Sequence, residues 1–166
     1  MSKFNHNFLP VEKGDTYRIY SCDDNRARID FISDSAIRVA LYKEKKRMLP
    51  TFCINPENEF LLKGRDRLDV SGFSLSAPEY STDENSESFT IGCGINIRLD
   101  LHNFILEYTL GDEVLFSDRR PLPYNFAGEF GKESYHYITR EKSEKIYGLG
   151  DKGGELNKSG RAYRIE

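Results

Sequence analysis

The sequence predicts an all-β protein whose strands form an antiparallel β-sandwich. Apolar and polar residues alternate with a period of two over several segments, as in strands with one buried face and one solvated face. Short turns rich in Gly, Asn, Asp and Ser separate these segments. No segment has a convincing helical period, so helices connecting parallel strands are not predicted. Two sheets that are each apolar on one face bury each other, which favours a sandwich.

Three segments show the alternation most clearly. Residues 35–42 place Ile37, Val39 and Leu41 on one face of a strand. Residues 95–102 and 104–110 repeat the pattern. Their apolar positions are Ile95, Ile97, Leu99 and Leu101 in the first, and Phe104, Leu106, Tyr108 and Leu110 in the second.

Turn residues lie between the predicted strands. Residues 33–35 separate the segment RIDFI from AIRVALY, and residues 102–103 separate two strands. Gly111 and Asp112 stand between EYTL and EVLF, which predicts a tight hairpin.

Three further segments interrupt the strand pattern. Residues 43–50 are predicted to be a basic loop, and residues 78–88 an acidic, polar loop. Residues 117–132 form a proline-containing connector whose apolar side chains should lie against the body of the protein.

The overall composition excludes several classes of protein. At 166 residues the chain suffices for one domain with a buried core. Its net charge of -3 argues against nucleic acid or an anionic membrane as a partner, because both bind basic surfaces. Residues 1–15 hold no apolar run of signal-peptide length, and no segment approaches a membrane span. Cys22, Cys53 and Cys93 are far apart and fit reduced thiols, so we expect a cytoplasmic protein.

Glycines near the end of the chain match a nucleotide-binding pattern. Gly148, Gly150 and Gly153 satisfy G-x-G-x-x-G, the pattern of a loop that binds a pyrophosphate. That function also needs a helix directly after the loop, and residues 154–164 have no amphipathic stripe. We therefore predict neither a nucleotide nor any other cofactor.

No catalytic or metal site is evident in the sequence. His6, His102 and His136 lie at no ligand spacing from one another or from a cysteine, and a metal site needs several convergent ligands. We expect them to face solvent or lie at strand edges, without forming a recognisable pair with a carboxylate. The 27 Asp and Glu residues mostly occupy turns or polar strand faces, where solvation explains them. No G-x-S-x-G element is present.

Two surface features have both a structural and a binding interpretation. The basic residues 43–47 either bind an anion or form a solvated loop that protects a sheet edge. Tyr135 and Tyr137 alternate on one face of SYHYITR, and they either stack on a sugar ring or pack under the connector.

The C-terminal sequence carries a family resemblance. Tyr147-Gly148-Leu149-Gly150-Asp151, followed by LNKSGRAY at residues 156–163, resembles the signature Y-G-L-G-[ED] … L-x-[KR]-x-G-x-x-[YF] of glycoside hydrolase family 31. The best-known members of that family are α-glucosidases and α-xylosidases, and the signature ends their N-terminal domain. The resemblance implies a β-sandwich related in shape to galactose mutarotase over residues 1–147. Residues 148–166 would begin a loop that leads to a (β/α)8 catalytic barrel, which this sequence does not contain.

The resemblance also implies a role for this loop. In family 31 the loop lies beside the catalytic pocket and helps to form its rim. The corresponding residues here are Gly148, Gly150, Asp151, Lys158 and Arg161. The glycines would permit positive φ at a sharp turn. The charged residues either hold the loop together and pin it to the next domain or, in the case of Asp151, lie near the sugar.

The sequence lacks the catalytic residues of the family. The family nucleophile lies in a W-x-D-M-N-type motif, and this chain has no tryptophan. Many members also have a tryptophan where this chain has Glu166, which leaves the substrate subclass open. We therefore expect the non-catalytic N-terminal domain of an α-glucosidase-like enzyme, with the barrel of the same polypeptide and an α-glucoside or oligosaccharide as partners. We also expect its C-terminal loop to be mobile without the barrel.

Two other functions remain alternatives. A sandwich of this kind can be a self-contained carbohydrate-binding module, although no tryptophan platform is present. It can also be an aldose 1-epimerase-like enzyme, which needs a paired acid and base. An exposed apolar patch would favour the domain of a larger enzyme over both.

Overall fold

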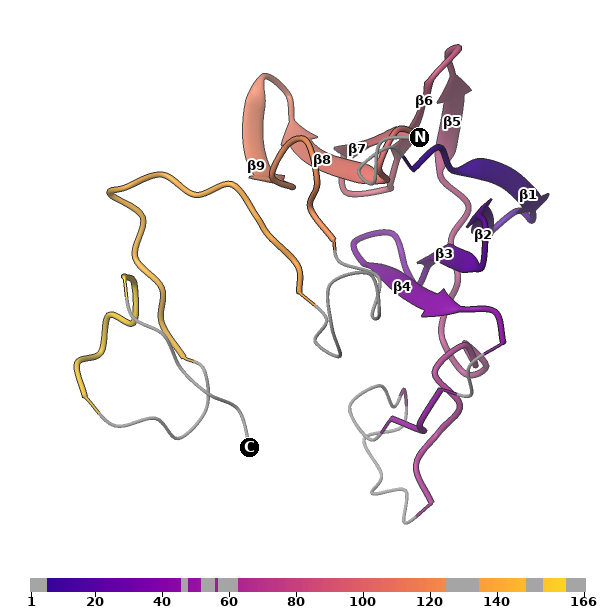
Figure 1. Ribbon diagram of the computed structural model, residues 1–166, viewed down its shortest axis with the longest axis horizontal. Helices are drawn as coiled ribbons and strands as arrows, with labels where there is room; N and C mark the ends of the chain where they lie inside the picture. Colours follow the sequence, from indigo (N-terminus) through magenta and orange to yellow (C-terminus); the bar gives the residue numbers. More distant parts are fainter. Residues whose placement is uncertain are drawn as a thin grey trace.

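Two antiparallel sheets, each built from one continuous stretch of sequence, face each other (Figure 1). The computed structural model describes residues 6–45, 48–51, 56, 63–124, 135–148 and 154–160. The first sheet has the order β1-β2-β3-β4: β1 (Leu9–Lys13), β2 (Tyr17–Cys22), β3 (Asn25–Phe31) and β4 (Ile37–Lys43). The second has the order β5-β6-β7-β8-β9: β5 (Glu79–Thr82), β6 (Ser86–Thr90), β7 (Ile95–Asp100), β8 (Ile105–Leu110) and β9 (Glu113–Ser117). The predicted antiparallel sandwich is confirmed.

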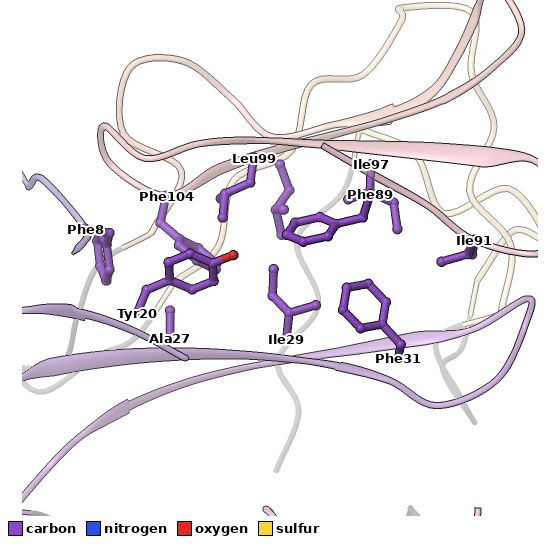
Figure 2. Packing of buried hydrophobic residues seen from close by; sticks show 11 residues of the cluster. Phe8, Tyr20, Ala27, Ile29, Phe31, Phe89, Ile91, Ile97, Leu99 and Phe104 are labelled. Carbon is purple, nitrogen blue, oxygen red and sulfur yellow. The ribbon is translucent and has the colours of Figure 1, made fainter. Parts of the chain in front are cut away.

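Side chains from both sheets fill the space between them (Figure 2). The Phe31 ring from β3 lies 5.2 Å from that of Phe89 on β6, and the Tyr20 ring from β2 lies 5.6 Å from that of Phe104. Each such side chain contributes about 1.5–3 kcal/mol when it is fully buried. The cluster consists of Phe8, Tyr20, Ala27, Ile29, Phe31, Phe89, Ile91, Ile97, Leu99, Phe104 and Leu106. The alternation predicted for residues 95–102 is confirmed by its buried members, and residues 37, 39 and 41 pack against the edge of the cluster.

The predicted turns are also confirmed. Ile32 donates its backbone N–H to Ala36 O at 2.9 Å and so closes the turn between β3 and β4. Gly111 has a φ of 57°, which a glycine adopts without strain, and it begins the two-residue turn between β8 and β9. Asn103 has a φ of 66°, in the left-handed region that Asn tolerates better than most residues.

The N-terminal residues 6–8 bind the second sheet before the chain enters the first. Phe8 donates its backbone N–H to Leu101 O at 2.9 Å, and Asn103 donates to His6 O at 2.7 Å. His6 is 7% exposed, so its predicted solvent-facing position is wrong. These bonds join the beginning of the chain to the turn between β7 and β8.

The acidic loop predicted at residues 78–88 is wrong, because this segment forms β5, a turn and β6. Glu87 on β6 is only 1% exposed and accepts hydrogen bonds from Tyr20 Oη at 2.5 Å and Tyr80 Oη at 2.8 Å. Lys13 Nζ lies 3.4 Å from the same carboxylate. Because three donors replace water around Glu87, an acidic residue can occupy the interior. Burial, followed by the hydrogen bond to Glu87, raises the pKa of Tyr20 above its ordinary range and keeps the phenol a donor.

Strand β2 lacks a clear apolar alternation for a similar reason. Arg18 stands two residues before the core residue Tyr20 and is 8% exposed. Its guanidinium lies 4.8 Å from the centre of the Tyr80 ring and donates to Tyr17 O at 2.8 Å. The apolar stem and the stacked guanidinium thus occupy a position where the pattern predicts an aliphatic residue.

A salt-linked turn lies in the segment between the two sheets. Asp69 accepts the backbone N–H of Ser71 at 2.8 Å and lies 3.0 Å from Arg65 Nε. The hydrogen bonds from Ser71, together with Arg65, lower the pKa of Asp69 from 3.8 to about 2.

The described residues contain no helix that is long and apolar enough to span a membrane. Cys93 is an exposed free thiol, Cys22 Sγ lies 4.0 Å from His6 Nδ1, and Cys53 lies outside the described residues.

We expect Tyr20→Phe to destabilise the fold by about 1–3 kcal/mol, because it leaves the Glu87 carboxylate buried without one of its donors. The measurement is the free energy of unfolding in urea. The control is Tyr17→Phe on the same strand, which removes a hydroxyl that bonds the exposed Glu12 and should change stability by less than about 0.5 kcal/mol. Equal effects of the two substitutions would show that the buried hydrogen bond has no special weight.

We expect Asp69 to make stability depend on pH in the acid range. Its pKa in the folded state is lower than the ordinary 3.8, so its ionised form stabilises the fold above that pH. This contribution is lost as the pH falls through about 2. A carboxyl-carbon NMR titration measures the pKa directly, and Asp69→Asn should abolish this part of the pH dependence. A midpoint at the ordinary value of 3.8 would contradict the prediction.

Candidate functional site

The predicted site residues lie in the C-terminal loop, residues 148–166, of which the structure describes part. Gly148 and Lys158 are among the described residues. Gly150, Asp151 and Arg161 lie outside them, so their placement stays a prediction.

Gly148 marks the turn at which this loop begins. Its φ is 89°, a conformation that residues with a side chain rarely adopt. A Cβ atom built on Gly148 would meet nothing within 4 Å, so the backbone angle rather than lack of space requires glycine here. The predicted use of Gly148 at positive φ is confirmed.

Hydrogen bonds close the loop onto the residues just before Gly148. Lys158 donates its backbone N–H to Ile146 O at 2.7 Å. The side-chain Oδ1 of Asn157 accepts the Ile146 N–H at 3.2 Å, the Ser159 N–H at 3.1 Å and the Ser159 hydroxyl at 2.8 Å. Lys158 itself is 7% exposed. The side-chain oxygen of Asn157 therefore joins Ile146, which precedes the loop, to Ser159 within it.

The chain leaves the two sheets before it reaches this loop. Residues 135–139 lie beside the end of β9, and the following residues run away from the sheets (Figure 1). Residues 145–147 form no strand, and Ile146 donates its N–H to the side chain of Asn157. Tyr147 is 56% exposed and Leu156 is 78% exposed. Apolar side chains just before the loop and within it are thus exposed to solvent.

The glycine pattern has no helix behind it in the described part of the loop. Residues 154–160 contain bends and a turn. Gly150 and Gly153 lie outside the described residues. With no helix N-terminus in residues 154–160, this segment lacks the backbone donors that bind a pyrophosphate.

The structure brings together a second polar group that the sequence does not predict. Asp118 follows β9 and is fully buried, and its Oδ1 lies 2.7 Å from His136 Nε2. Its Oδ2 accepts the Leu106 N–H at 2.9 Å and the Tyr124 hydroxyl at 3.0 Å. The expectation that no histidine pairs with a carboxylate is therefore wrong. Such a contact between residues 18 positions apart depends on the path of the connector, which has no periodic signal.

This group orients a histidine through a buried carboxylate. Both oxygens of Asp118 already accept hydrogen bonds from three donors. The ring of Tyr124 stacks on that of His136, with centroids 4.3 Å apart and an angle of 14°. Burial and the nearby Asp118 raise the pKa of Tyr124 above its ordinary range, so its hydroxyl remains a donor. The imidazole of His136 is held by its Nε2 and its face, and its side chain is 41% exposed.

The tyrosines of SYHYITR are held by the connector. Tyr137 donates its N–H to Pro123 O at 2.7 Å, and the guanidinium of Arg119 lies 3.9 Å from the centre of its ring. Tyr135 lies beside it, with ring centroids 5.7 Å apart. These contacts support the packing interpretation over a sugar-stacking platform, because one face of Tyr137 is already covered.

Other candidate groups form simple surface contacts. Lys45 lies 3.8 Å from Asp24, and His102 Nδ1 lies 2.8 Å from Asn7 Oδ1 at an exposed position. Within the described ranges no three His, Cys, Asp or Glu side chains converge as metal ligands would.

Taken together, the described residues form a sandwich of two sheets, followed by residues 140–148 and 154–160, which lie away from the sheets (Figure 1). The chain belongs to the family described as the glycosyl hydrolase 31 N-terminal galactose mutarotase-like domain, whose model matches residues 26–166. The predicted family and the predicted mutarotase-like fold are both confirmed.

Solved structures show the same fold within a longer chain. One is the GH31 dextranase of Flavobacterium johnsoniae in a mutant form complexed with isomaltotriose, with a TM-score of 0.70 and 15% identity. The same dextranase complexed with glucose gives a TM-score of 0.69 and 15% identity. In both, the match covers 96% of this chain, which spans only 18% of the length of the dextranase chain. No curated protein matches the sequence.

We expect Asn157→Ala to open the base of the loop without unfolding the sandwich. Three donors lose their shared acceptor, which should speed hydrogen exchange of the Ile146 and Ser159 amides by about tenfold. NMR-detected amide exchange makes the measurement, and the core amide of Ile97 serves as the internal reference. Asn157→Asp keeps an acceptor at the same place and should leave exchange near its original rate. Unchanged exchange in the alanine variant would contradict the anchoring role.

Proposed function

We propose that this chain is the non-catalytic N-terminal domain of a cytoplasmic, α-glucosidase-like retaining glycoside hydrolase. The observation that carries the proposal is the family match, which runs to residue 166 and so includes the C-terminal loop. The similar dextranase chain is several times longer than this one, which leaves room there for a catalytic domain. The proposed division places the sandwich at residues 1–147 and the loop toward the barrel at residues 148–166.

The proposed substrate of the complete enzyme is an α-glucoside or an α-linked oligosaccharide. This rests on the similar dextranase, which is described as complexed with isomaltotriose and with glucose. Linkage would be selected by the barrel, because the glycosidic bond is cleaved there.

The proposal assigns no catalytic residue to this chain. A retaining glycosidase needs two carboxyl groups about 5–5.5 Å apart across the scissile bond. Three carboxylates buried in the sandwich, those of Asp30, Glu87 and Asp118, instead accept hydrogen bonds from neighbouring side chains. Asp30, for example, is held by Arg28 at 2.7 Å and by Arg38 at 2.6 Å. Each of these buried carboxylates is engaged in hydrogen bonds within the fold.

The proposed contribution of the domain to catalysis is the rim of the substrate pocket. Gly148, Gly150, Asp151, Lys158 and Arg161 would form that rim. The closure of the loop by Asn157 supports the assignment, because a loop must hold its shape to line a pocket. The exposed side chains of Tyr147 and Leu156 are suited to packing on a neighbouring domain.

One observation bears on the epimerase alternative. The pairing of His136 with Asp118 supplies an oriented histidine, which is one of the two groups that the reaction needs. Asp118 is 1% exposed and so is not placed to meet a sugar as the second group. A self-contained carbohydrate-binding module remains the other alternative.

The test is one NMR titration of this chain with maltose and with isomaltose. Protein amide signals and the anomeric signals of the sugar are followed together, and cellobiose serves as the β-linked control. We expect neither amide shifts nor new sugar signals, because the pocket would need the barrel. New glucose signals would overturn the proposal by revealing an active site within this chain. Faster exchange between the anomers would favour the epimerase, and saturable amide shifts without turnover would favour the binding module.

In the complete parent polypeptide, we expect Asp151→Ala to lower kcat/KM on the preferred α-glucoside by about tenfold, as for the loss of one hydrogen bond to a charged group. Asp112→Ala, in the hairpin between β8 and β9, is the matched control and should leave kcat/KM unchanged. An Asp151→Ala enzyme with unaltered kinetics would remove this residue from the proposed rim.

A further inference from the structure

The place where the chain leaves the sandwich is held by a short antiparallel pairing. Thr139 donates its N–H to Ser117 O at 2.8 Å, and Arg119 donates to Tyr137 O at 3.0 Å. The pairing opposes Asp118 to Ile138 and Tyr124 to His136. Residues 135–139 therefore continue the second sheet beyond the end of β9. We call residues 135–148 the exit segment, since they lead from this pairing to the C-terminal loop.

A few backbone bonds at a sheet end would fray unless side chains supported them. The support here is the buried side chain of Asp118, which contacts β8 on one side and the exit segment on the other. Its Oδ2 accepts the Leu106 N–H from β8, and its Oδ1 contacts His136 on the exit segment. Through one carboxylate the exit segment is bonded to the interior strand β8 as well as to the end of β9.

The chemistry of the contact defines the tautomer of His136. An ionised carboxylate is an acceptor only, so the nitrogen of His136 at 2.7 Å must carry the proton. The Nε2–H is therefore the donor, and Nδ1 is left as the second ring nitrogen. The groups that face the ring are Tyr124, stacked upon it, and Phe116 from β9 at 6.4 Å.

We propose that the Asp118–His136 pair fixes the point and direction at which the exit segment leaves the sandwich, with His136 as a positioning residue that acts through its Nε2–H. The consequence for the enzyme rests on the proposed function: a loop that must meet a pocket in another domain needs a fixed origin on its own domain. The pair supplies that origin, because without His136 the Oδ1 of the buried Asp118 carboxylate would lose its 2.7 Å hydrogen bond.

Two substitutions of His136 separate its donor from its ring. His136→Gln keeps an N–H donor at a similar reach and loses the stacked ring, whereas His136→Phe keeps the ring and loses the donor. We expect His136→Phe to speed exchange of the Tyr137 and Thr139 amides by about tenfold or more, and His136→Gln by less than about threefold. His102→Gln, at an exposed histidine bonded to Asn7, is the matched control and should have no effect on these amides. Protection of the Ile97 amide in the core reports that each variant is folded.

A nitrogen NMR spectrum of the imidazole tests the same pair independently of stability. In the native chain we expect His136 to be the Nε2–H tautomer. In Asp118→Asn the amide group can turn its N–H₂ toward the ring, so the histidine becomes an acceptor at Nε2 and carries its proton on Nδ1. If Asp118→Asn fails to fold, the native tautomer and the two His136 variants still decide the question.

Each outcome bears on the proposal. A native Nδ1–H tautomer, or equal exchange in His136→Phe and His136→Gln, would overturn the pair as the element that fixes the exit segment. These readouts use the chain alone without sugar, so they fail or succeed separately from the proposed function. In the complete parent polypeptide, kcat/KM should fall in His136→Phe and recover in His136→Gln. No difference between these variants there would overturn the positioning role in catalysis.

Discussion

The hydrogen bond from Tyr20 to Glu87 crosses the sandwich and ties one sheet to the other at a buried point. Apolar packing alone would allow the two sheets to slide, since the hydrophobic effect has no preferred direction. A directional bond to a buried carboxylate penalises any displacement that breaks it. The aromatic pairs Phe31–Phe89 and Tyr20–Phe104 fill the interface around it. Among the described strands β1 to β9, the placement of one sheet on the other therefore depends on a buried polar contact as well as on apolar packing.

Sequence patterns predicted the strands whose inner faces are purely apolar. Ile97 and Leu99 on β7 alternate with polar residues. The turn at Gly111 is predicted by the residue pair Gly111 and Asp112. No strand was predicted at β2, and a loop was wrongly predicted at β5–β6; Arg18 and Glu87 occupy inward positions there. A charged residue in a sequence is predicted to be solvent-exposed unless its partners are known. The ring partners of Arg18 and the donors to Glu87 lie on other strands. The failures thus identify where the interior is polar.

The candidate site was predictable to the extent that it is local. Gly148 could be recognised because positive φ is a property of a single residue, and the signature around it is contiguous. The Asp118–His136 pair could not be recognised, because it forms only after the connector returns the chain to the end of β9. The role of Asn157 was missed for another reason: one side-chain oxygen replaces backbone pairing at the base of the loop, and asparagine is common in any loop.

Each sheet is made from an unbroken run of the chain, so the four strands of the first sheet are synthesised before any strand of the second. The ribosome delivers β1 to β4 complete while the second sheet does not yet exist. During that interval Ile29 and Phe31 lie on an open surface that only later strands can cover. A nascent chain in this state exposes an apolar sheet face and unpaired strand edges. Both favour association with other nascent chains on the same messenger RNA.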